Sequence, residues 1–178
     1  MSAQDSKLFV ISGPSGAGKG TLVTRVRERR SNLGLTVSAT TRAPRKGEVD
    51  GVNYFFLTRE EFDRRVANGE FVEWAEVHGN CYGTLVSEVQ SKLASGSSLI
   101  LEIDVQGALQ VKERFPEAVL IFIKPPSLEV LRERLVGRGT ETPETIELRM
   151  ANAADELALA DRYDDVVVND DLDRATDE

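Results

Sequence analysis

A glycine-rich stretch near the start of the chain, GPSGAGKGT at residues 13–21, constrains the fold more than any other feature. It follows the apolar run Leu8–Ile11 and leads into a helical pattern with apolar residues at 22, 23 and 26. A strand, a glycine-rich turn and a helix in this order are typical of a phosphate-binding loop, and an incidental glycine turn is the weaker interpretation. Glycines let several backbone N–H groups converge on one anion, and Lys19 adds a full charge. The candidate phosphate ligands are Gly13, Pro14, Ser15, Gly16, Ala17, Gly18, Lys19, Gly20 and Thr21.

One position in this stretch departs from the usual pattern of a phosphate-binding loop. The residue after the lysine is commonly Ser or Thr, whose hydroxyl binds Mg²⁺, but here it is Gly20, followed by Thr21. The motif therefore predicts a nucleotide-phosphate site and says less about how a metal ion is held.

Composition limits the class of protein. A chain of 178 residues is long enough for one substantial core and too short for two ordinary domains. Its net charge of −8 makes nucleic acid and anionic membranes poor partners for the surface as a whole. The single cysteine excludes an internal disulfide and fits a reducing compartment. We find no signal peptide and no apolar run as long as a membrane span, so we expect a cytoplasmic protein.

Strand-like and helical patterns alternate along most of the chain. This alternation predicts an α/β fold, in which a parallel sheet is covered by helices on both faces and ligands bind at the carboxyl ends of the strands. Residues 38–90 interrupt the core pattern and are predicted to form an insertion with its own small sheet. The predicted strands are 7–11, 35–38, 53–57, 71–78, 98–103, 118–123 and 166–168. Predicted helices run to about residue 33 after the loop, over 58–69, 85–94 and 105–114, and from 127, 142 and 170. Thr58, with Glu61 three residues later, predicts a capping box, and Thr142-Pro143-Glu144 predicts a helix start. Residues 80–84 are predicted to form a turn.

A second group of cationic residues suggests another anion site. Arg42 and Arg45 are three residues apart, with Tyr54 and Tyr82 not far away in the sequence. Alone they are equally compatible with a solvated basic loop. In an acidic chain with a phosphate loop, a second anion site is the better account, because guanidinium groups bind two phosphate oxygens at once and tyrosine hydroxyls add further bonds. Two such sites indicate a phosphoryl donor and a phosphorylated acceptor.

Other polar residues are weaker candidates. Glu73 lies on an alternating strand, where a surface carboxylate is the default, and Asp104 ends a buried strand, where a carboxylate needs a partner. Residues 104–107 also fit the D-x-x-G element of regulatory GTPases, but the chain has no guanine-reading N-K-x-D element. Arg138 lies between two glycines, as expected of a closing lid, whereas Arg132 and Arg134 are predicted to be surface charges.

At this point the sequence closely resembles the guanylate kinase family, the nucleoside monophosphate kinases that make GDP from GMP. The resemblance covers nearly the whole chain in the family's order. The matching segments are SGPSGAGKGT at 12–21, 38–48, Gly51 with Tyr54 and Phe55, 71–75, 79–84, 102–107, 137–141 and 168–172.

The resemblance implies a P-loop NTPase-type core, a GMP-binding α+β insertion and a helical lid within one domain. It places the core at 1–37, 91–126 and 156–178, the insertion at 38–90 and the lid at 127–155. It assigns the GMP phosphate to Ser38, Arg42, Arg45, Tyr54 and Tyr82, and guanine to Glu73, Thr84 and Asp104. It assigns ATP to residues 13–21 with Asn169 near adenine, and catalysis to Lys19, Arg42, Arg138 and Arg149.

The function implied is ATP-dependent phosphorylation of GMP with Mg²⁺, which we expect to be held mainly by ATP phosphates and waters because Gly20 lacks a hydroxyl. The expected state is a monomer or homodimer without nucleic-acid or membrane partners. Two alternatives stay open. One is a guanylate-kinase-like protein-interaction module, which would be expected to lose Lys19, and the other is a P-loop kinase of another small phosphorylated acceptor.

Overall fold

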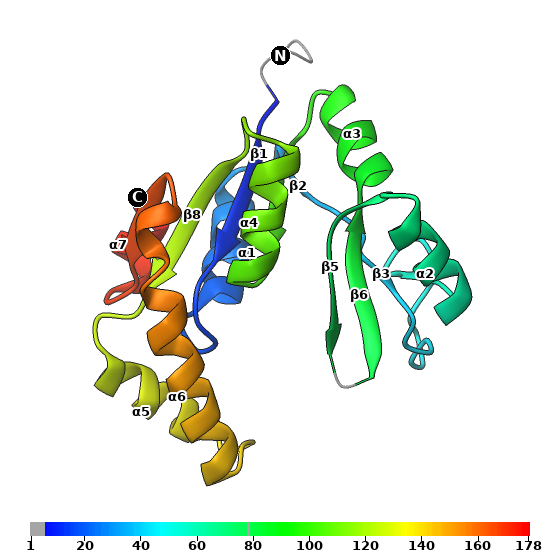
Figure 1. Ribbon diagram of the computed structural model, residues 1–178. Coiled ribbons are helices and arrows are strands. Elements are labelled where there is room, and N and C mark those ends of the chain that lie inside the picture. The colour runs from blue at the N-terminus through cyan, green and yellow to red at the C-terminus, as the bar shows by residue number, and fades with distance from the viewer. Residues whose placement is uncertain (1–5, 78) are drawn as a thin grey trace.

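The core of the protein is a five-stranded sheet in which every pair of neighbouring strands is parallel (Figure 1). The computed structural model describes residues 6–77 and 79–178. The strand order is β2-β7-β1-β8-β9, so the first strand lies at the centre of the sheet. The strands are β1 (Leu8–Ser12), β2 (Leu33–Leu35), β7 (Ser98–Glu102), β8 (Val119–Lys124) and β9 (Asp165–Val168).

Helices cover both faces of this sheet, as the apolar runs in its strands require. Along β7, Leu99 and Leu101 pack with α3 (Val86–Ala94) and α4 (Val105–Arg114), while Ile100 between them packs on the opposite face. That opposite face is covered by α1 (Lys19–Arg29) and α7 (Leu172–Asp177). Burial on both sides explains why the strand carries no polar alternation, and the predicted α/β fold is confirmed.

A second, smaller sheet lies beside the core, on the right in Figure 1. Its strands, in the order β4-β3-β6-β5, are β4 (Phe55–Phe56), β3 (Ala39–Thr40), β6 (Asn80–Leu85) and β5 (Phe71–Val77). The helix α2 (Arg59–Ala67) packs on it through Phe62, whose ring stacks on that of Phe71 with centroids 4.4 Å apart. The predicted capping box of α2 is present, because Thr58 and Glu61 each bind the other's backbone N–H.

Two further helices, α5 (Leu128–Gly137) and α6 (Pro143–Leu157), pack against each other beyond the carboxyl ends of the core strands (Figure 1). They form their own small apolar cluster around Leu131, Leu135 and Ile146. The start of α6 is as the sequence predicts, with Pro143 in the first turn and the Thr142 hydroxyl accepting the backbone N–H of Thr145. A 3-10 turn, η2 (Ala160–Arg162), then leads into β9.

The structure differs from the sequence prediction in several elements. The first helix ends at Arg29 rather than near residue 33, and β2 begins at Leu33 rather than at 35, because Leu33–Leu35 pairs with Ser98–Ile100 of β7. The short strand β3, in which Ala39 and Thr40 are fully buried, is absent from the predicted strands.

Another error concerns residues 80–84, which form most of strand β6 instead of a turn. Gly83 suggested a turn, but it lies within the strand, and glycine is needed there because β5 approaches its backbone closely. A Cβ atom at Gly83 would lie 2.7 Å from the Phe71 ring and 2.9 Å from the Glu73 carbonyl oxygen. The predicted end of the preceding strand at His78 lies outside the described residues. Among the described helices, none is long and apolar enough to cross a membrane.

Candidate active site

The glycine-rich loop connects β1 to α1 at the carboxyl edge of the core sheet. Its first glycine is required by close contact, because a Cβ atom on Gly13 would lie 2.2 Å from the Ile123 carbonyl oxygen of β8. Gly18, further along the loop, adopts φ 92° directly before the first residue of α1. The loop therefore directs its backbone and the N-terminus of α1 at one point, the geometry that binds phosphate.

Lys19, the first residue of α1, folds back over this loop. Its Nζ donates hydrogen bonds to the carbonyl oxygens of Gly13 at 2.5 Å and Pro14 at 3.2 Å. Burial lowers the pKa of Lys19, and the nearby carboxylates Glu102 and Glu156 act in the opposite direction. The lysine is thus a partly buried cation held at the mouth of the loop.

Two residues from distant elements, Asn169 and Arg134, donate hydrogen bonds to a carbonyl oxygen of the loop. Asn169, which follows β9 and is 6% exposed, donates from Nδ2 to the Ala17 carbonyl oxygen at 2.8 Å. Arg134 of α5 donates to the Asn169 carbonyl oxygen at 2.8 Å and approaches the Ala17 carbonyl oxygen at 3.5 Å. The sequence prediction that Arg134 is a surface charge is wrong. Its spacing of four residues from Arg138, which puts both on one face of α5, was the available signal.

The two predicted lid arginines lie on the same side as the loop. Arg149 of α6 donates to the Ser15 hydroxyl from Nη1 and pairs with Glu141 through Nε at 2.8 Å. Arg138 is the exposed residue that ends α5, and its charge is close enough to contribute to the lowered pKa of Lys19. Lys19 and Arg149 therefore contact the loop directly, and the charge of Arg138 acts on Lys19 from nearby.

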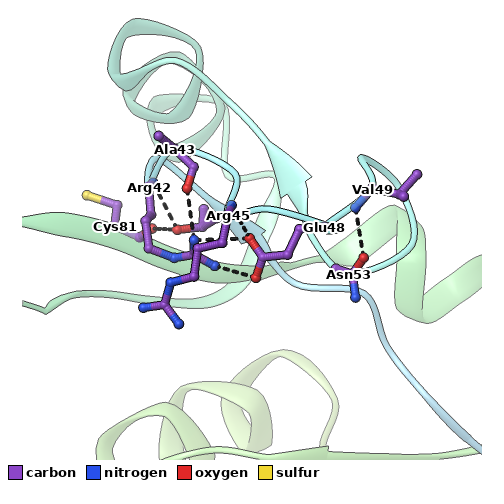
Figure 2. A network of polar contacts seen from close by, with 8 residues as sticks. Arg42, Ala43, Arg45, Glu48, Val49, Asn53 and Cys81 are labelled. Carbon is purple, nitrogen blue, oxygen red and sulfur yellow. Dashed lines mark hydrogen bonds and ion pairs between the residues drawn. The ribbon is translucent and has the colours of Figure 1, made fainter.

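The second group of predicted ligands includes Arg42 and Arg45, which lie in the loop after β3 (Figure 2). The Arg42 guanidinium lies over the Tyr54 ring at 5.3 Å, and the Tyr54 and Tyr82 rings meet edge to face at 6.3 Å. Arg45 is exposed in the loop that follows. Ser38 lies just before β3, where its carbonyl oxygen accepts the Phe55 N–H at 2.9 Å.

The predicted guanine ligands form a third cluster, between β5, β6 and the start of α4. The Glu73 carboxylate accepts the Thr84 hydroxyl at 2.8 Å, and Thr84 is 1% exposed. Burial raises the pKa of Glu73, the Thr84 bond opposes this shift, and the charge of Asp104 reinforces it. Asp104 itself accepts the Gly107 N–H at 2.7 Å and caps α4.

Asp104 also connects the two sides of the site. It follows β7, which lies next to the central strand β1, and its charge acts on the pKa of both Glu73 and Lys19. The phosphate loop and the predicted base-reading residues therefore lie on either side of one carboxylate. This arrangement suits a reaction that transfers a group from one nucleotide to another.

Comparison with known proteins places this site in a family context. The family model described as guanylate kinase matches residues 5–178. Curated proteins named guanylate kinase include one from Halalkalibacterium halodurans, 54% identical over 99% of this chain and 87% of its own length. Another, from Gloeobacter violaceus, is 59% identical over 94% of this chain and 82% of its own. The crystal structure of guanylate kinase from Anaplasma phagocytophilum superposes with a TM-score of 0.71 at 38% identity, covering 97% of this chain and 81% of that one.

Proposed function

The chain belongs to the guanylate kinase family and transfers a phosphate from ATP to GMP, giving ADP and GDP, and we propose how its residues divide that reaction. The matching relatives are named guanylate kinase. The two alternatives, a protein-interaction module and a kinase of another phosphorylated acceptor, are therefore not favoured.

We propose that residues 13–21 bind the ATP phosphates. The convergence of loop N–H groups at the N-terminus of α1 supports this role, and so does the Lys19 ammonium at the mouth of the loop. Asn169 would lie near adenine, and its bond to Ala17 supports a position next to the loop. Arg138 and Arg149 would neutralise charge on the transferring phosphoryl group, since both approach the loop from α5 and α6.

On the acceptor side, we propose that the GMP phosphate binds between the arginines and tyrosines around β3. The stacked position of Arg42 on Tyr54, next to Tyr82, supports a preformed anion site. Its members would be Ser38, Arg42, Arg45, Tyr54 and Tyr82.

The observation that carries the assignment of the base is the bond between the half-buried Glu73 and the buried Thr84. A carboxylate accepts the two adjacent donors of guanine, N1–H and the exocyclic amine, and adenine offers an acceptor at N1 instead. Thr84 holds one oxygen of Glu73 at 2.8 Å, which fixes the orientation of the carboxylate, and Asp104 lies close by. Sites built on such bonds discriminate by roughly 10⁴, because the wrong base leaves a buried polar group unpaired.

The chemistry then requires positioning and charge neutralisation more than proton transfer. The acceptor phosphate is already an anion, so it attacks the terminal phosphorus in line without a general base. Lys19, Arg138 and Arg149 would stabilise the negative charge that spreads over the phosphoryl oxygens.

Kinases of this class generally use Mg²⁺ with ATP, and the residues around the loop fit a metal held mostly by phosphates and waters. Gly20 offers no hydroxyl, and a Cβ atom there would lie 3.5 Å from the Glu102 carboxylate. Within the described residues no cluster of three or more His, Cys, Asp or Glu could hold a metal. Mg²⁺ typically needs only one or two protein carboxylates beside substrate phosphates, so Glu102 would hold it, directly or through water. When bound, the ion would neutralise part of the negative charge of the ATP phosphates.

We further propose the functional division of the chain that the sequence suggested. Residues 38–90 form the GMP-binding region, residues 127–155 form the lid, and the rest forms the core. We propose that the protein works in the cytoplasm as a monomer or homodimer, with ATP and GMP as its ligands and without nucleic acid or membrane. Its net charge of −8 supports this choice.

The test of the base assignment is Glu73→Gln. We expect kcat/KM for GMP to fall at least about tenfold, because a charge-assisted bond becomes neutral. The preference for GMP over AMP should narrow, because the amide can donate to N1 of adenine. The measurement is ADP formation with GMP and with AMP in parallel.

Glu76→Gln on the same strand is the matched control, since its exposed carboxylate pairs with Arg59 at 3.1 Å. It should leave both substrates unaffected. An unchanged ratio of GMP to AMP in Glu73→Gln would mean that guanine is read by other residues.

A further inference from the structure

A carboxylate lies inside the proposed acceptor-phosphate cluster, where an anion is unexpected (Figure 2). Glu48 accepts Arg42 Nη1 at 3.1 Å and Arg42 Nη2 at 2.9 Å, one on each oxygen. It also accepts the backbone N–H of Arg45 at 2.7 Å. The side chains of Arg42 and Glu48 are 14% and 19% exposed, so most of this pair is removed from water. Hydrogen bonding within the pair raises the pKa of Arg42 and lowers that of Glu48, which keeps both charged.

The bonding pattern leaves one edge of the Arg42 guanidinium free of Glu48. A guanidinium has five N–H donors. Both donors of Nη1 are used, one by Glu48 and one by the Ala43 carbonyl oxygen at 2.8 Å, and Nη2 gives one donor to Glu48. The remaining donors are Nε–H and the second N–H of Nη2, which lie parallel on the other edge. That edge is the fork that binds two oxygens of a phosphate.

We propose that Glu48 is a positioning residue for the acceptor phosphate. It holds Arg42 by one edge, with Tyr54 under the guanidinium plane at 5.3 Å, so that the opposite edge is presented to GMP. Its third bond fixes the backbone at Arg45 in the same loop. This inference rests on the proposed role of Arg42 as a phosphate ligand. A competing role, in which Glu48 occupies the phosphate site itself, is disfavoured because its carboxylate uses the other edge.

The two roles predict opposite signs for Glu48→Gln. Removing a negative charge near an anion site should by itself strengthen GMP binding. If Glu48 positions Arg42, the variant instead weakens GMP binding about tenfold, because an amide places an NH₂ group against the guanidinium. Guanosine, which lacks the phosphate, should bind with unchanged affinity. Isothermal titration calorimetry with GMP and guanosine measures both.

Glu60→Gln is the charge-matched control, on the exposed face of α2 in the same part of the chain. It should bind GMP as well as or slightly better than the parent protein. If Glu48→Gln fails to fold by circular dichroism, Glu48→Asp replaces it, since the charge stays and the shorter side chain loses part of the three-bond contact. An intermediate, GMP-specific loss is then expected.

A double-mutant cycle with Arg42→Ala separates this inference from the proposed function. Arg42→Ala should weaken GMP binding and leave the affinity for guanosine unchanged. In the Arg42→Ala background, Glu48→Gln should weaken GMP binding by less than a further factor of about two. If Arg42→Ala has no effect, the proposed phosphate site is wrong. If it has one, the inference about Glu48 is overturned by tighter GMP binding in Glu48→Gln, by no change, or by an equal loss of GMP and guanosine.

Discussion

The two regions proposed to bind anions in this protein are built in different ways. The donor loop at 13–21 uses backbone groups on a rigid support: it lies against Ile123 of β8, and Asn169 and Arg134 bind its carbonyl at Ala17. The acceptor segment around β3 uses side chains on two-residue strands and exposed loops, with Arg42 oriented by a carboxylate and an aromatic ring.

The difference corresponds to what each region has to recognise. Backbone N–H groups bind the phosphates of any nucleoside triphosphate alike, so a donor site made from them is strong and general. An acceptor must be recognised as a monophosphate of guanine, which needs side chains with a defined donor and acceptor pattern. Rigid backbone therefore suits the common substrate, and adjustable side chains suit the specific one.

The largest expected effect is on the donor side. Lys19→Met should lower phosphate transfer by about 10³-fold, the loss typical of one preorganised charge-stabilising group, while the fold is retained. Burial disfavours the charged lysine, so its removal costs little stability. The assay is ADP formation with ATP and GMP, together with a thermal unfolding curve.

Lys7→Met provides the control, because Lys7 is exposed just before β1. Near-normal turnover in folded Lys19→Met would mean that the loop backbone alone suffices for catalysis.

The next effect compares the rigidity of the two regions through matched glycine substitutions. Gly13→Ala should reduce the free energy of unfolding by about 3 kcal/mol or more, because the new Cβ meets a carbonyl oxygen at 2.2 Å and φ is 150°. Gly47→Ala, in the acceptor segment, should cost only about 1 kcal/mol, since φ is 88° but no atom lies within 4 Å. Urea unfolding of both variants measures the difference, and equal losses would show that the two regions are equally rigid.

The smallest effect concerns the base-reading carboxylate. The pKa of Glu73 is raised by burial, so between its ordinary and its raised value the folded state binds more protons than the unfolded state. The free energy of unfolding therefore falls as pH rises through this window and stays lower above it. Glu73→Gln removes the free-energy cost of the ionised carboxylate and keeps an acceptor for the Thr84 hydroxyl. The free energy of unfolding of this variant should therefore exceed that of the parent protein by on the order of 1 kcal/mol at pH 7.

That gain should shrink as pH falls toward the ordinary pKa of glutamate, about 4. Urea unfolding of parent and variant at several pH values is the measurement, with Glu76→Gln alongside. A gain that does not change with pH would point to packing in place of ionisation.

The sequence predicted best where local chemistry decides the structure. The glycine loop, the capping box at Thr58 and the start of α6 at Pro143 are all local features, and the structure has each of them. Predictions were wrong where a distant strand decides. Residues 33–35 and 80–85 are strands because β7 and β5 pair with them, and the residue types within each segment do not indicate which strand pairs with it.

Within the site, residue type predicted the candidate ligands but not the contacts that orient them. Arg134 was treated as a surface charge, and Glu48 was only part of a matching segment. Their roles depend on contacts with Asn169 and Arg42 in three dimensions. A charged residue on a helix or in a loop does not by itself indicate which residue it will contact. Its spacing from a second functional residue is the only local indication.

The two carbonyl oxygens that hold Lys19 also bear on product release. When a phosphate leaves the loop, the ammonium loses its anionic partner while it stays partly buried, and an unpaired cation there would slow dissociation. Gly13 and Pro14 provide a resting position at 2.5 and 3.2 Å for the same ammonium. Under the proposed role of Lys19 as a ligand of the ATP phosphates, ADP would depart as the lysine moves from the phosphate oxygens to these carbonyl oxygens, and its charge would keep an acceptor during turnover.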